Sequence, residues 1–180
     1  MKAVGAAFPV SSARKTVDSK GRVQLPTAQA TALGSDVYVC RGHGSFLEIY
    51  GLLAWQRYLA KLVAAAERGP RRYRALLRHV LGSAVAAKVD PQSRLVIPRD
   101  ILDWAKLSIG SDDDSREVMV VGVGECVEIW NPDLYDREMD EARPTLGDIW
   151  DEARHEYVAA GAAETDLLDP PAPAEDDGPE

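Results

Sequence analysis

The chain has little cysteine and histidine, and it has no long apolar run. Its 180 residues include 2 Cys and 3 His. Cys40 and Cys126 have no His or Cys at metal-ligand spacing, so we expect both to be small apolar strand residues. No apolar segment approaches the roughly 20 residues that cross a bilayer, and residues 1–10 lack the apolar centre of a secretory signal. These absences predict a cytoplasmic protein.

Signatures of catalysis are missing as well. His43, His79 and His155 are scattered, and none is paired in sequence with a nucleophile or a set of metal ligands. The glycine-bearing segments lack the strand-to-helix context of a phosphate-binding loop, and there is no nucleophile elbow. The sequence therefore predicts a protein that is not an enzyme and that has no catalytic residue, cofactor or metal.

Charge is distributed unequally along the chain. The formal net charge is -8 at pH 7. Residues 1–110 contain 17 Lys and Arg against 7 Asp and Glu, a net of +10, whereas residues 111–180 contain 4 against 22, a net of -18. Such asymmetry is typical of proteins that bind nucleic acid and carry an acidic tail, although a solvated surface is the simpler explanation of any single charged run.

The most informative feature that is present is an internal repeat. The segment VDSKGRVQLP at residues 17–26 returns as VDPQSRLVIP at residues 89–98. Each copy is followed by a strand-like segment in the order acidic, apolar, aromatic, which is EIY at residues 48–50 and EIW at residues 128–130. This is duplication of a structural unit, and it decides the architecture before any single residue does.

Each copy predicts a tight turn, a short helix and two further strands. Asp18 can accept hydrogen bonds within its own turn, and Gly21 can adopt a positive φ at no steric cost. Pro26 ends the strand after the turn, because it has no N–H to donate to a sheet. We expect a helix over 27–33 with strands over 37–41 and 46–50, and in the second copy strands over 87–90 and 95–97, a helix through 101–105, and strands over 118–121 and 126–130.

Further helices are expected between and after the two copies. Apolar residues recur at helical spacing over 54–68 and 71–81, and again over 132–143 and 146–158. From Ala159 onward Ala, Pro, Asp and Glu predominate, which is typical of disorder. The predicted organisation is a flexible arm 1–13, repeat 1 at 14–56, a helical linker 57–84, repeat 2 at 85–131, C-terminal helices 132–158 and a disordered acidic tail 159–180.

The doubled pattern resembles the MraZ family of bacterial transcription regulators over roughly residues 14–150. The resemblance rests on the Asp-x-Lys-Gly-Arg-x-x-x-Pro motif, on its second copy after a helical linker, and on the closing EIY and EIW strands. It implies a mainly β fold with α-helices (α+β), in which two AbrB-like swapped-hairpin repeats interlock as a pseudo-dimeric β-barrel. It also implies a ring-shaped homo-oligomer at the nucleoid. Such a protein binds double-stranded DNA at promoter direct repeats upstream of the division and cell-wall gene cluster, usually to repress it.

The same resemblance implies that the motif turns face DNA. With the basic pair just before the first motif added, the candidate DNA-binding residues are Arg14, Lys15, Asp18, Lys20, Arg22, Asp90 and Arg94. Arg offers a planar fork that matches phosphate or a guanine edge, and Lys acts as a point charge. The alternative for the first motif is an Asp18–Arg22 bridge that only shapes the turn. Both roles can hold together, since Asp can orient Arg.

Three features depart from the family pattern. Ser93 stands where the motif has Gly, so either a serine adopts the left-handed region or the second turn has another shape. Residues 27–32 supply no basic side chain where the family commonly has one. The acidic loop 112–114 and the acidic tail are additions, and we expect the tail to compete with DNA for the basic turns.

The densest basic cluster lies in the linker and has two interpretations. Arg71, Arg72, Arg74 and Arg78 could contact the DNA backbone. A polar helix face that also covers apolar surface at subunit contacts is the favoured interpretation.

Three functions are therefore compared. A sequence-specific transcription regulator is the leading hypothesis. The alternatives are an antitoxin of the AbrB-like superfamily with an acidic inhibitory tail, and an oligomeric scaffold without specific DNA binding.

Overall fold

The structure is a computed structural model that describes residues 11–108 and 115–159 of the chain. The acidic loop expected at 112–114 lies outside these residues, as does the expected acidic tail apart from Ala159. The chain divides into two compact units, Met1–Arg137 and Glu138–Glu180, and the barrel described below belongs to the first.

Helices and strands follow one another in the order that the repeat predicts. The first repeat contains β1 (Ser12–Asp18), β2 (Arg22–Gln24), α1 (Thr27–Leu33), β3 (Asp36–Arg41) and β4 (Phe46–Gly51). The second contains β5 (Val85–Lys88), β6 (Arg94–Val96), α4 (Arg99–Trp104), β7 (Ser115–Gly122) and β8 (Val127–Trp130). The helices between and after the repeats are α2 (Leu52–Arg68), α3 (Tyr73–Ser83), α5 (Pro132–Ala142), the 3-10 helix η1 (Arg143–Thr145) and α6 (Leu146–Ala159). Because β1 begins at Ser12, the last two residues of the segment expected as an arm belong to a strand.

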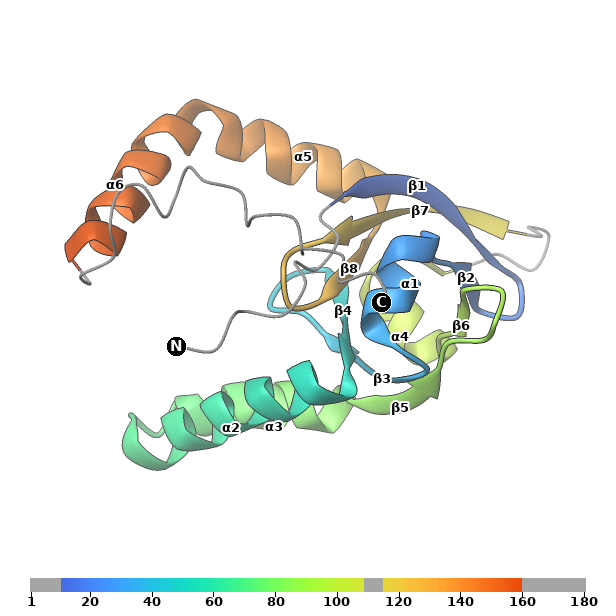
Figure 1. The fold of residues 1–180 in the computed structure, drawn as a ribbon, viewed down its shortest axis with the longest axis horizontal. Helices are drawn as coiled ribbons and strands as arrows, with labels where there is room; N and C mark the ends of the chain where they lie inside the picture. Colours follow the sequence, from blue (N-terminus) through green and yellow to red (C-terminus); the bar gives the residue numbers. More distant parts are fainter. Residues whose placement is uncertain (1–10, 109–114, 160–180) are drawn as a thin grey trace, which may run out of the picture. The chain divides into compact units, whose positions relative to one another are not determined.

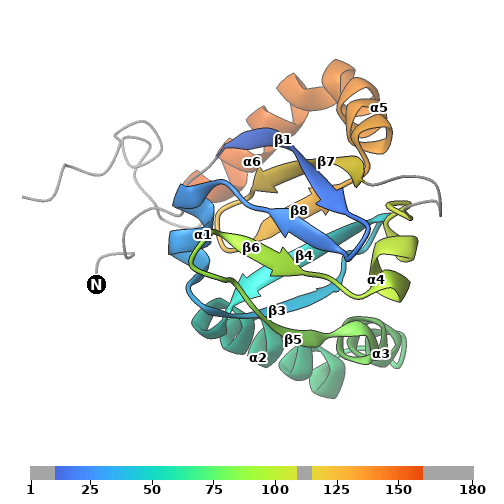
Figure 2. The same cartoon turned by 90° about the vertical axis from the view of Figure 1, so that its right-hand side faces the viewer.

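The eight strands form one antiparallel sheet that curls into a nearly closed barrel (Figure 1, Figure 2). The strand order is β5-β3-β4-β8-β7-β1-β2-β6. The two ends of this order approach one another through an antiparallel bridge between Val89 and Leu95. The predicted α+β class and the predicted barrel are confirmed.

Each repeat completes its sheet with strands of the other repeat. β1 pairs with β7, and the equivalent strand β5 pairs with β3. The other contacts between the repeats join equivalent strands, β2 with β6 and β4 with β8. The repeats are therefore interlocked about an approximate twofold relation, as the resemblance implied.

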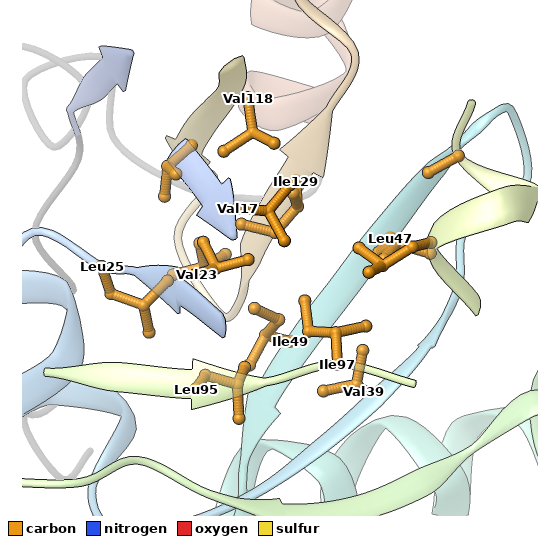
Figure 3. Close-up of a cluster of buried hydrophobic side chains, with 14 of the residues drawn as sticks. Val17, Val23, Leu25, Val39, Leu47, Ile49, Leu95, Ile97, Val118 and Ile129 are labelled. Carbon is orange, nitrogen blue, oxygen red and sulfur yellow. The ribbon is translucent and has the colours of Figure 1, made fainter. Parts of the chain in front are cut away.

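Aliphatic side chains from both repeats fill the barrel interior (Figure 3). Successive residues of a strand point to opposite faces, so every second residue of β4 and β8 lies inside. Val17, Val23, Leu47, Leu95 and Ile129 are each 0% exposed. Burial of this kind contributes about 1.5–3 kcal/mol for each large aliphatic side chain, so the shared core holds the two repeats together.

Two short helices lie at opposite ends of the barrel (Figure 2). α1 starts after Pro26 and ends at Gly34, whose φ of 78° suits a residue without a Cβ. Leu33 of α1 and Ile101 and Leu102 of α4 are 4%, 1% and 2% exposed and join the core. The helices thus close the interior while they leave the outer face of β2 and β6 uncovered.

α2 and α3 lie side by side and pack against β3 and β4 (Figure 1). Trp55 of α2 is buried and stacks on Tyr38, with 5.1 Å between the ring centroids. Cys40 and Cys126 are in the same cluster, and burial raises the pKa of both thiols, that of Cys126 to about 12. Both cysteines are buried free thiols, as expected of small apolar residues, but only Cys40 lies in a strand, because Cys126 is in the bend before β8.

In the C-terminal unit, α6 exposes an apolar face. Leu146, Ile149 and Trp150 recur at helical spacing and are 50%, 51% and 60% exposed. A helix of this length is marginal in water unless its apolar face packs against something. Among the described residues, no helix has the length and hydropathy that a membrane span needs.

A pair of glutamates lies on the outer side of the seam between β4 and β8. Glu48 and Glu128 are directly opposite one another in the register. Tyr50 Oη donates to Glu48 at 3.0 Å, and Trp130 Nε1 donates to Glu128 at 2.8 Å. Burial raises the pKa of both carboxyl groups, and for Glu48 the opposing Glu128 raises it further. Two like charges in this position weaken the seam when both are ionised.

We predict that Glu128→Gln raises the urea midpoint of unfolding at pH 8 and has no such effect at pH 4. The folded-state pKa values lie above the unfolded ones, so these groups support the fold fully below the unfolded pKa and lose that support as pH rises through the folded pKa. Gln keeps an oxygen for Trp130 Nε1 and removes the charge. Glu67→Gln on the exposed side of α2 is the matched control. An equal gain at both pH values for Glu128→Gln would contradict the repulsion.

Candidate nucleic-acid interface

The first motif folds into a turn organised around one carboxylate. Asp18 Oδ1 accepts hydrogen bonds from the backbone N of Lys20 and from that of Arg22, both at 2.9 Å. Asp18 Oδ2 accepts one from Arg22 Nε at 2.6 Å. Gly21 N donates to the backbone O of Asp18 at 2.8 Å. One side chain therefore fixes the backbone of the turn and the direction of the Arg22 side chain together.

The second motif repeats this geometry. Asp90 Oδ1 accepts from the backbone N of Gln92 and of Arg94, both at 2.9 Å, and Asp90 Oδ2 accepts from Arg94 Nε at 2.8 Å. Arg94 Nη2 also donates to Gln92 Oε1 at 3.2 Å. The Asp–Arg bridge that was considered as the alternative is thus present in both copies, and the side chains of Arg22 and Arg94 remain 43% and 42% exposed.

Both turn carboxyl groups are held in the charged form. Partial burial raises the pKa of Asp18, but the hydrogen bonds from Arg22 and Lys20 outweigh it, so this pKa lies below its ordinary value. For Asp90 the backbone N–H of Arg94 is the largest cause of a lowered pKa. The hydrogen bonds therefore support the turns fully above the ordinary pKa of Asp and are lost as pH falls through the lowered value.

The fourth residue of each turn, counted from the aspartate, adopts the left-handed backbone conformation. Gly21 has a φ of 76° and Ser93 a φ of 60°. Ser93 N donates to the backbone O of Asp90 at 2.9 Å, as Gly21 N does to Asp18. Of the two possibilities for the second turn, the structure therefore shows a strained serine in the same turn shape.

β2 and β6 connect the two turns into one antiparallel ribbon (Figure 2). Ile97 N donates to the backbone O of Gly21, and Leu25 N donates to that of Ser93, both at 2.9 Å. Each turn is therefore bonded to the strand that leaves the other turn. The turns flank the two ends of a ribbon whose register pairs Arg22 with Val96, Val23 with Leu95, and Gln24 with Arg94.

The ribbon has one buried face and one solvent face. Val23 and Leu95 point into the core and are 0% exposed. Their neighbours along the strands consequently point outward. The outer face carries Arg22, Gln24, Arg94 and Val96. Lys20 is exposed in the first turn at one end of this face.

Sequence reasoning missed several residues of this surface. Arg99 at the start of α4 donates through Nη2 to the backbone O of Ser19 at 3.3 Å, so a cation of the second repeat lies beside the first turn. Thr27 is its counterpart after the first motif, and an alignment of the two copies beyond the prolines would have revealed Arg99. The outward position of Val96 follows only from the register of the ribbon.

The basic pair before the first motif lies in different surroundings. Arg14 Nη1 pairs with Glu117 at 2.8 Å, and Arg14 Nη2 pairs with Asp136 of α5 at 3.0 Å. Lys15 is on the strand face that it shares with Val17 and is half-buried. The structure thus brings the other five candidates together on the two turns and does not place Arg14 among them.

The linker arginines are also separate from the ribbon. Arg71, Arg72, Arg74 and Arg78 are exposed at and beyond the start of α3, which packs against β3 and α2. The outer face of β2 and β6 is on another side of the barrel (Figure 2). This placement agrees with the interpretation of α3 as a polar helix face.

We predict that Gly21→Ala destabilises the protein by roughly 2 kcal/mol or more, measured by urea denaturation. A Cβ on Gly21 would lie 2.4 Å from the backbone O of Ile97, and the left-handed φ adds strain. In the second turn, Ser93→Gly should change the unfolding free energy by less than about 1 kcal/mol, because relief of strain and the greater freedom of the unfolded chain oppose each other. Equal losses for both variants would contradict the described difference between the turns.

The sequence matches a known protein family and several named proteins. A model described as "MraZ protein, putative antitoxin-like" matches the chain twice, over residues 12–78 and 80–146. A protein of Pediococcus pentosaceus named Transcriptional regulator MraZ is 30% identical over 134 residues, which are 74% of this chain and 88% of that protein. Proteins with the same name from Bifidobacterium longum and Caldicellulosiruptor saccharolyticus are 31% and 32% identical, over 76% and 70% of this chain and 85% and 82% of theirs. The two model matches divide the chain at the linker, with one interlocked repeat in each.

Proposed function

The chain belongs to the MraZ family, and we propose that it is a sequence-specific DNA-binding transcriptional regulator that acts at the nucleoid. The finer proposal is that it binds direct repeats upstream of the division and cell-wall gene cluster and represses that cluster. One observation carries the proposal: two Asp–Arg turns of the same geometry flank a single exposed ribbon. The names of the related proteins support the same class of function.

The spacing of the turns suits the major groove of DNA. Gly21 is bonded opposite Ile97, and Ser93 is bonded opposite Leu25, so four residues of strand separate the two turns. At roughly 3.3 Å per residue the turns are about 13 Å apart. B-DNA has a major groove about 12 Å wide that admits a two-stranded ribbon. Turns spaced in this way can each approach the phosphates on one side of the groove.

The arginines are oriented for contact beyond the protein surface. In the first turn, Asp18 binds Arg22 through Nε, and among the described residues neither Nη atom of Arg22 has a protein partner. An Arg held in this way can present two parallel N–H groups to guanine O6 and N7 or to a phosphate. Lys20 and Arg99 add positive charge at the same end of the ribbon. Arg14 would have to exchange two carboxylates for phosphate in order to contribute.

Assembly of several copies would raise the affinity. One chain offers only two turns, and linked sites can increase apparent affinity by two or more orders of magnitude when their spacing matches the DNA. The uncovered apolar face of α6 supports contact between chains. We therefore include a ring-shaped homo-oligomer in the proposal.

The description of the matching family model favours one second candidate, an antitoxin. An antitoxin would bind a toxin protein through its C-terminal region and use the barrel to regulate its own promoter. The two candidates are distinguished by whether removal of residues 159–180 abolishes binding to a protein encoded beside this chain.

We predict that Arg22→Ala abolishes the gel shift of the DNA upstream of the chain's own gene at moderate salt, and that Arg94→Ala weakens it less. The first turn has Lys20 and Arg99 beside its arginine, whereas Gln92 binds the guanidinium of the second. Lys20→Ala should flatten the log-log salt dependence by about 0.9, as expected for one lost phosphate contact.

The control is Lys61→Ala on α2, an exposed lysine that is 3.9 Å from Glu125 and far from the ribbon in sequence and fold. It should bind like the parent protein. Parent-like binding by both arginine variants would refute the proposed role of the turns, and a footprint of the parent on the upstream DNA would define the site.

We predict that Trp150→Glu lowers the number of subunits measured by sedimentation without unfolding the barrel. Trp150 is 60% exposed on the apolar face of α6, so a charge there disfavours burial against a second chain. Asp148→Glu on the same helix is the control. An unchanged subunit number for Trp150→Glu would exclude this face as a contact between chains.

A further inference from the structure

The outer face of the β2–β6 ribbon is only partly symmetric. Arg22 and Arg94 occupy equivalent positions at the start of the two strands. Two residues later the equivalent positions hold Gln24 in β2 and Val96 in β6. The duplication therefore repeats the arginine and does not repeat its outward-facing neighbour.

Gln24 is engaged with the protein. Its Nε2 donates to the backbone O of Gln92 at 2.8 Å and, more weakly, to that of Leu25 at 3.3 Å. The bond to Gln92 fastens the second turn to β2. The amide thus supports the turn that contains Arg94.

Val96 has different surroundings on the same face. It is directly opposite Arg22 in the register and is 56% exposed, although the other outward positions of the ribbon are polar. A β-branched side chain suits a strand. At this exposure, however, folding buries little of the apolar area of Val96. The side chain is therefore suited to a contact outside the chain.

The neighbours of Val96 limit what that contact can be. A purely apolar partner would cover the Nη atoms of Arg22, which have no partner among the described residues and would then be buried without an acceptor. The major groove can supply an acceptor for Arg22 and an apolar contact for Val96 within one base step. Guanine offers the acceptors O6 and N7, and thymine offers its methyl group. Directly opposite side chains in a sheet have Cβ atoms about 4.5–5.5 Å apart, so Arg22 and Val96 are near enough to contact neighbouring bases, which are stacked about 3.4 Å apart.

Resting on the proposed function, we infer that Val96 is a specificity-determining residue that contacts the methyl group of a thymine adjacent to the guanine bound by Arg22. Gln24 provides no such contact on the other half of the ribbon. A fully symmetric ribbon would bind a site equally in both orientations, whereas this face distinguishes them. Sites repeated in one direction can then each be bound in the same orientation.

The test replaces thymine by deoxyuridine, which lacks only the methyl group, at each thymine of the footprint in turn. One position beside an essential guanine should weaken binding of the parent protein roughly fourfold, the effect of losing about one buried methyl group. Val96→Ala should weaken binding to thymine DNA by a similar factor and bind both DNAs equally. Val96→Ile keeps the γ-methyl group and should keep the preference for thymine.

Val123→Ala is the matched control, because Val123 is 47% exposed in the loop between β7 and β8. It should retain the full preference for thymine. Unfolding midpoints of all variants should match that of the parent, since neither valine is in the core.

Each other outcome is decisive. If the parent binds specifically but no deoxyuridine substitution matters, or if Val96→Ala keeps the preference, the inference is wrong and the proposed function stands. If Val96→Ala changes the subunit number and leaves base preference intact, the side chain contacts protein instead of DNA. If the parent binds no DNA, the proposed function fails and the inference fails with it.

Discussion

The structure depends on the exchange of strands between its two repeats. One edge of β1 is bonded to β7, and one edge of β5 is bonded to β3, so the backbone groups on these edges have partners only through the other repeat. This exchange places β2 against β6, and it is that pairing which brings the two turns to the ends of one ribbon. The candidate interface is thus a direct product of the way in which the barrel closes.

Much of this arrangement could be predicted from the sequence. The duplicated motif gives two turns, and the Asp–Arg bridge that was considered as the alternative for the first turn is present in both. Pro26 and Gly34 delimit α1 at the expected residues. These features are local, because a turn or a helix end is determined by the residues within it and beside it in the sequence.

Other features could not be predicted, because they depend on pairs of residues far apart in the chain. The exposure of Val96 is set by the register of β6 on β2. The bond from Arg99 to the first turn joins the two repeats across the ribbon. Arg14 was expected with the turns on grounds of charge alone, and its pairing with Glu117 and Asp136 is decided by β7 and α5. Whether these residues touch DNA stays a prediction.

The helices α2 and α3 join the two repeats in one polypeptide. Closure of the barrel is consequently an intramolecular event, and its equilibrium does not shift when the protein is diluted. A barrel made from two identical chains would separate at low concentration and would have to keep both halves the same. The covalent link removes both restrictions, so mutations could accumulate independently in the two halves.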